Sequence, residues 1–205
     1  MLAKKLVILA NSIKHGDRCV AGKCLSTGRW VRPVSTADGG ALTFNQIQCR
    51  NSHGIFPAKN LQKVTIPLES SVPLLNQPEN YLIAANSEWQ QNNKICTDEL
   101  VNMLDYPISL WGEGNRVSYA AIEQSQIVLE ESLCLIQTEN LRFEYSQYGK
   151  PRAVFFYRGV KYDLPITDQN ISSIVREQRK ILGILCISLA QEYYGYCYKV
   201  VAAIY

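Results

Sequence analysis

Three consecutive segments near the start of the chain decide the fold: KKLVILANSI (residues 4–13), GDRCVAGKCL (residues 16–25) and STGRWVRPVS (residues 26–35). Each contains the Leu, Val, Ile or Trp residues that favour strands. Gly16 and Gly28 stand in short polar stretches that are typical of turns. The pattern therefore predicts three short antiparallel strands joined by tight turns.

The rest of the chain continues in short strands with a few short helices. Residues 36–60 are polar and contain several glycines, which predicts a loop with at most one short element. Residues 97–104 and 168–180 begin with polar N-cap residues and predict helices. Further strands are expected at residues 61–68, 81–84, 132–145, 152–157, 161–166, 182–189 and 196–205.

Many short strands at close spacing favour small barrels or sandwiches over a layout of alternating strands and helices. The chain of 205 residues is long enough for one domain or two small ones. We predict a mainly β fold with a few short helices (β or α+β). The weakest pattern lies near residues 105–130, so we expect one unit over residues 1–115 and a second over residues 116–205.

The net charge of +3 hides a strong asymmetry. Residues 1–35 hold seven Lys and Arg side chains and one acidic residue, whereas residues 79–144 hold eleven acidic residues and three basic ones. A basic segment favours an anionic partner. An uneven distribution of this size is also common in proteins that bind no anion, so both interpretations stay open on charge alone.

Several classes of protein are excluded or disfavoured. The chain has no run of 18 apolar residues and no export signal, so we expect a cytoplasmic protein without a membrane partner. Seven irregularly spaced cysteines and two histidines give no paired ligand motif, so we predict no metal site. The sequence lacks phosphate-loop, GxGxxG, GxSxG and HExxH motifs, so we predict no cofactor and, as the better-supported interpretation, no catalysis.

The candidate binding residues lie in the basic head of the chain. On a strand Trp30 and Arg32 share one face, where an indole could stack on a base and a guanidinium could hold a phosphate. Arg29, Lys14 and Arg18 could add phosphate contacts. The alternative is structural: Trp30 would fill a core and Arg32 would form an ion pair.

A second candidate group lies near the end of the chain, where Tyr193, Tyr194, Tyr196 and Tyr198 crowd beside Lys199. We predict that Tyr198 stacks on a base and that Lys199 contacts phosphate. A tyrosine-lined barrel rim without a ligand is the alternative.

These residues also carry a family resemblance. The blocks NSIK (11–14), RCVAG (18–22) and GRWVRPVS (28–35) resemble the prokaryotic dual-OB-containing domain family. Shorter matches follow at QPENY (77–81) and GYCYK (195–199), and the resemblance runs from about Lys4 to Tyr205. It implies two small OB-like barrels packed together and a looser association with prokaryotic defence. The helix expected over residues 97–104 would then be a helical insert in the first barrel. OB folds commonly bind single-stranded nucleic acid, oligosaccharide or proteins.

The leading hypothesis is a non-enzymatic module that binds single-stranded nucleic acid or a nucleotide-like anion. Two alternatives remain: an accessory subunit that docks on a protein partner, and a sensor with a pocket for a small ligand. Asp17 departs from the small residue that the family more often has in the first turn, and its charge would weaken an anion site at Lys14 and Arg18.

Overall fold

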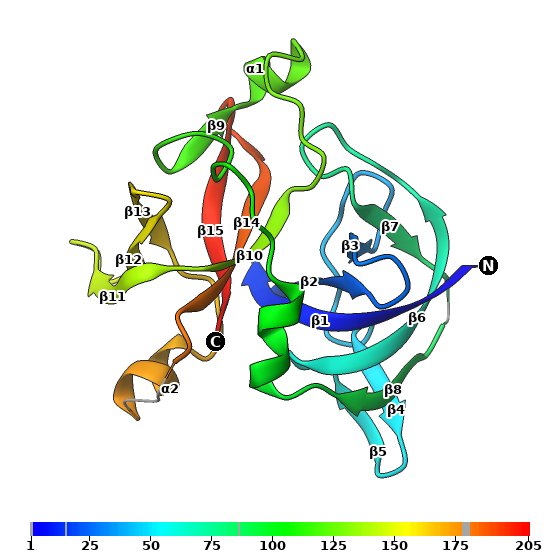
Figure 1. Cartoon of the computed structure of the whole chain (residues 1–205). Coiled ribbons are helices and arrows are strands. Elements are labelled where there is room, and N and C mark those ends of the chain that lie inside the picture. The colour runs from blue at the N-terminus through cyan, green and yellow to red at the C-terminus, as the bar shows by residue number, and fades with distance from the viewer. Residues whose placement is uncertain (1, 15, 86, 178–180) are drawn as a thin grey trace. The chain divides into compact units, whose positions relative to one another are not determined.

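A computed structural model describes residues 2–14, 16–85, 87–177 and 181–205. The chain divides into two compact units, Met1–Met103 and Leu104–Tyr205. Strands predominate in both units and the helices are short (Figure 1), so the mainly β fold expected from the sequence is confirmed. None of the helices within the described ranges has the length and apolar character that a membrane span requires.

Five strands of the first unit close into a barrel: β1 (Leu2–Lys14), β2 (Asp17–Cys24), β3 (Trp30–Val34), β6 (Gln62–Ser71) and β7 (Asn80–Ile83). Their order is β1-β2-β3-β7-β6, and β6 pairs back onto β1. Only the β3–β7 pairing among these strands is parallel. This closed arrangement of five strands is that of an OB barrel.

Strand β1 is long because it pairs with two other strands, β6 and β2. Its first half pairs with β6 and its second half pairs with β2, with a bulge between Ile8 and Ala10. A bulge bends a strand and increases its twist, which lets β1 turn the corner of the barrel. Leu6 and Ile8 point into the hydrophobic core together with Val20 and Val31.

The connection between β3 and β6 contains a hairpin, β4 (Gln48–Asn51) and β5 (Gly54–Pro57), which the sequence did not predict. Local patterns do not predict this hairpin, because most of its side chains are polar or exposed. Only Cys49 and the neighbouring Ile47 and Ala58 reach the core.

Strand β8 (Trp89–Lys94) pairs with β4 and β6, and the 3₁₀ helix η1 (Thr97–Met103) follows where a short helix was expected.

The second unit has the same strand order with its first strand split in two. The elements are β9 (Arg116–Ser118), α1 (Tyr119–Glu123), β10 (Leu133–Gln137), β11 (Glu139–Tyr145), β12 (Pro151–Tyr157), β13 (Val160–Pro165), α2 (Ile171–Arg176), β14 (Ile184–Tyr193) and β15 (Tyr196–Ile204). One sheet has the order β10-β14-β15-β9 and the other β11-β12-β13. A parallel bridge between Ile166 and Val201 connects them on the β13–β15 side. The result is a curled half-barrel of OB type.

The hydrophobic core of the second unit includes residues that precede its first strand, β9. Leu110 packs with Phe155, Tyr162 and Leu164 in one hydrophobic cluster. Leu110, which precedes the boundary expected near residue 115, therefore contributes to the core of the unit Leu104–Tyr205. A helix was expected over residues 168–180, and the structure has α2 at Ile171–Arg176. Residues 178–180 of the expected helix lie outside the described ranges.

Candidate functional site

The strand face singled out from the sequence lies on the outside of the first barrel. Val31 points into the core, so Trp30 and Arg32 point to the opposite side of β3, as the alternation of a strand requires. Both are nevertheless buried, with 2% and 8% of their surface exposed. The ammonium of Lys23 lies 5.5 Å from the centre of the Trp30 ring.

A buried ion pair accounts for Arg32. Its Nε donates to Glu79 Oε1 over 2.9 Å, and the backbone amide of Arg32 donates to the carbonyl of Glu79. A ring with no accessible face cannot stack on a base, and a guanidinium held by a carboxylate is already neutralised. The burial of Trp30 and the ion pair of Arg32 therefore speak against the binding roles expected for them.

The other basic residues of the first unit differ in accessibility. Arg29 is exposed. Arg18 is half-buried, with its guanidinium 5.7 Å from the ring centre of the exposed Phe44 and its buried Nε without a hydrogen-bond partner among the described residues. Lys14 ends β1, and its side chain lies outside the described part of the chain. The side chains of Arg18 and Arg29 are therefore at least partly accessible to solvent.

Lys199 is fully buried and points away from the surface expected for it. Its Nζ donates to the carbonyls of Gly112, Glu113 and Gly114 over 2.6, 3.2 and 3.0 Å. The ammonium thus fastens a glycine-rich loop to β15. Burial lowers the pKa of Lys199 from 10.5 to about 8, so the side chain is still mainly protonated at neutral pH.

Replacing Lys199 with Met is expected to destabilise the second unit by about 2 kcal/mol at neutral pH, because three carbonyls lose a charged donor. The unfolded chain binds more protons than the folded one between pH 8 and 10.5, so the contribution of Lys199 to stability rises with pH over this range. Urea unfolding of both proteins on either side of pH 8 measures this. If the difference in the free energy of unfolding between wild type and variant became smaller as the pH increases, the lowered pKa assigned to Lys199 would be contradicted.

In the second candidate group, Tyr196 and Tyr198 are half-buried, and both contact the side chain of Arg116. Arg116 on β9 stands opposite Tyr198 on β15, and its guanidinium lies 3.8 Å from the ring centre of Tyr196. Arg116 also donates to the Tyr198 hydroxyl over 3.5 Å, and this hydrogen bond raises the pKa of the guanidinium. The two tyrosine rings lie 6.4 Å apart in an edge-to-face arrangement.

The turn that precedes these tyrosines extends the surface. Tyr193 and Tyr194 are 63% and 81% exposed, and their rings meet edge to face at 4.4 Å. The turn ends in Gly195, whose φ of 78° suits glycine. We call Arg116, Tyr193, Tyr194, Tyr196 and Tyr198 the tyrosine–arginine surface. The sequence indicated its tyrosines but gave no signal for Arg116, which lies far away along the chain on a strand of three residues.

Within the described ranges, no group of three or more His, Cys, Asp or Glu side chains is arranged to hold a metal ion. None of the seven cysteines, all of which are described, forms a disulfide.

The strand order within each unit defines a protein of two OB-like units. Residues 4–204 match the model of the dual OB-containing domain family, so the chain belongs to this family and the resemblance noted from its motifs is confirmed. No curated protein and no solved structure gives a match.

Proposed function

We propose that the protein is a non-enzymatic module that binds single-stranded nucleic acid or a nucleotide-like anion through the tyrosine–arginine surface. The observation that carries the proposal is the arginine of β9 lying against two tyrosines of β15 on an accessible face. OB folds commonly bind nucleic acids, and membership of the family supports this class of ligand.

The chemistry of the surface fits a flexible strand better than a duplex. An exposed tyrosine offers a flat ring on which an unpaired base can stack, and every base has such a face. A guanidinium beside it can pair with a phosphate through two hydrogen bonds. Together they supply the combination of stacking and charge that sequence-tolerant single-strand binding uses.

The location within the OB-like unit also supports the proposal. In OB folds the loops after the first and fourth strands border the binding face. In the second unit these are the β11–β12 turn, beside which Tyr145 and Tyr148 are exposed, and the β14–β15 turn with Tyr193 and Tyr194. Both loops thus carry accessible aromatic rings. We propose Arg18, Arg29 and Lys14 of the first unit as a separate set of phosphate contacts. We also place the protein in the cytoplasm.

The test is the binding of a fluorescein-labelled oligothymidine of about 12 nucleotides, within the usual range of site sizes, followed by anisotropy. We expect Tyr198→Ala and Arg116→Gln each to weaken binding about tenfold, which corresponds to about 1.4 kcal/mol. Tyr106→Ala is the matched control, since Tyr106 is an exposed tyrosine of the same unit that lies outside the surface. Binding should weaken as salt increases, because phosphate contacts release counterions.

Two results would contradict the proposal. One is the absence of binding at low salt. The other is binding that Tyr198→Ala and Arg116→Gln leave unchanged relative to Tyr106→Ala.

One observation favours a second function, docking on a protein partner. The β4–β5 hairpin ends the sheet of the first unit and leaves Ile55 and Phe56 about half exposed. Aromatic and apolar side chains on a sheet edge suit a protein interface. Replacing both residues with Ser should abolish capture of such a partner while oligonucleotide binding stays unchanged.

A further inference from the structure

The start of β2 carries a buried guanidinium nitrogen that no group of the protein satisfies. Arg18 lies two residues before Val20 on this strand, and Val20 belongs to the hydrophobic core, so both side chains point to the same side. The Nε of Arg18 is buried and has no hydrogen-bond partner among the described residues. A buried donor without an acceptor costs about 1–3 kcal/mol, and its presence in a folded protein requires an explanation.

The charge of Arg18 also lacks a partner, in contrast to that of Arg32. The guanidinium of Arg32 pairs with Glu79, whereas no ion pair joins Arg18 to an acid in the described part of the chain. Asp17 is the neighbour of Arg18 in sequence, but adjacent residues of a strand point to opposite sides. The guanidinium of Arg18 is therefore able to pair with an anion from outside the protein.

An exposed aromatic ring lies beside this guanidinium. The ring centre of Phe44 is 5.7 Å from Arg18 Cζ, and Phe44 is 52% exposed. Ile13, which stands opposite Arg18 on β1, is 44% exposed. Phe44 belongs to residues 39–49, which contain no acidic side chain that would repel an anion. An accessible ring next to an unpaired guanidinium suits a ligand that carries both a flat ring and a negative charge.

The backbone around Phe44 is fixed by hydrogen bonds within the first unit. The amide of Arg18 donates to the carbonyl of Leu42 over 2.7 Å, and the amide of Leu42 donates to the carbonyl of Arg18 over 2.8 Å. Within the turn that contains Phe44, the amide of Thr43 donates to Gln46 Oε1 over 2.8 Å. The guanidinium and the ring are therefore held side by side before a ligand binds, which reduces the entropy that binding costs.

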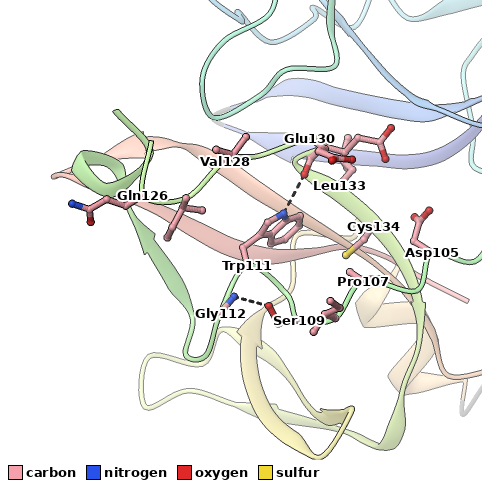
Figure 2. Close-up of a pocket in the computed structure, with 13 residues that line it drawn as sticks. Asp105, Pro107, Ser109, Trp111, Gly112, Gln126, Val128, Glu130, Leu133 and Cys134 are labelled. Carbon is pink, nitrogen blue, oxygen red and sulfur yellow. Dashed lines mark hydrogen bonds between the residues drawn. The ribbon is translucent and has the colours of Figure 1, made fainter. Parts of the chain in front are cut away.

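The second unit contains a pocket of about 730 Å³ (Figure 2), but its lining does not suit an anionic ligand. Trp111 lies in the middle of this lining, and its indole Nε1 donates to the carbonyl of Glu131 over 3.1 Å. None of the described residues that line the pocket is Lys or Arg. The pocket therefore provides no positively charged side chain for a phosphate, whereas the start of β2 does.

We propose that Arg18 and Phe44 form a nucleotide-binding site of the first unit, separate from the tyrosine–arginine surface. The guanidinium pairs with a phosphate through two hydrogen bonds, one of them from Nε, while the base stacks on Phe44 and covers Ile13. This inference rests on the proposed function for the class of its ligand. Because its residues belong to the other unit, the two sites can be distinguished in one titration.

The probe is thymidine 5′-monophosphate, compared with uncharged thymidine and with inorganic phosphate, each of which offers only one of the two groups. Binding to the isotope-labelled full-length protein is followed through the Arg18 Nε–H signal and the amides of residues 42–44. We expect a saturable shift with the monophosphate and about tenfold weaker binding of thymidine and of phosphate. Residues 193–198 report the tyrosine–arginine surface in the same spectra, so a missing response there contradicts the proposed function and not this site.

Arg18→Lys and Phe44→Ala should each weaken binding of the monophosphate about tenfold at this site. The lysine keeps the positive charge but loses the planar fork, and it places a methylene where the unpaired Nε lies, so the variant should be at least as stable as wild type. Arg50→Lys and Phe56→Ala are the matched controls, because both residues are exposed in the same unit and lie outside this site. Neither control should change the affinity.

Three results would overturn the proposal: equal binding of the three probes, no shift at Arg18 and residues 42–44 at any probe concentration, or an affinity that Arg18→Lys and Phe44→Ala leave unchanged. Tighter binding of N-acetylphenylalaninate than of the monophosphate would assign the site to a carboxylate of a protein segment and would also overturn it.

Discussion

Glu79→Gln is expected to destabilise the first unit by about 3–5 kcal/mol, because it removes the carboxylate charge that pairs with the buried guanidinium of Arg32. The substitution preserves the shape of the side chain and an oxygen that can accept from Arg32 Nε. The decrease in the free energy of unfolding therefore measures the effect of the lost charge rather than of altered packing. Urea unfolding followed through the buried Trp30 and Trp89, both in this unit, measures it.

The matched control replaces both partners with apolar residues of similar size, Arg32→Met/Glu79→Leu. Removing both charges is expected to leave stability within about 1 kcal/mol of wild type or to increase it. If the Glu79→Gln single variant proves as stable as wild type, the ion pair is not buried as described. A loss of oligonucleotide binding in Arg32→Ala would for the same reason reflect folding rather than contact with phosphate.

Gly22→Ala is expected to destabilise the first barrel by about 3 kcal/mol or more, because β1 and β2 approach too closely there for a side chain. An added Cβ would lie 2.9 Å from the carbonyl carbon of Val7 and 3.1 Å from Ile8 Cα, and closer still to the Val7 oxygen. All three atoms are backbone, so relief requires the strands to separate. Thermal unfolding of the variant gives the magnitude.

Gly28→Ala separates this close approach from the general effect of adding a methyl group. A Cβ at Gly28 meets no atom within 4 Å, and only its φ of 70° opposes the substitution, at about 1 kcal/mol. Equal destabilisation by the two variants would mean that the β1–β2 contact is looser than described.

Local sequence patterns were sufficient to predict the first strands and the β-rich class. Alternation along the third strand also predicted correctly that Trp30 and Arg32 share a face. It could not reveal that this outer face is buried, because the partner of Arg32 is Glu79, 47 residues away along the chain. Period-2 alternation gives the side of a strand on which a residue lies, but not what covers it.

The same limit applies to the second unit. Tyr198 and Lys199 are adjacent in sequence but point to opposite sides of β15, so one reaches the surface and the other is buried. Arg116 and the residues around Trp111 come from segments without regular pattern, where long-range pairing rather than local propensity decides the structure.

We propose above all that the tyrosine–arginine surface of the second unit binds single-stranded nucleic acid. The most direct measurement is the titration of isotope-labelled protein with unlabelled oligothymidine, followed by amide chemical shifts. We predict that the largest shifts cluster on β9 and on residues 193–198, including Arg116 and Tyr198. Shifts confined to residues 28–35, or the absence of shifts at saturating oligonucleotide, would contradict the account.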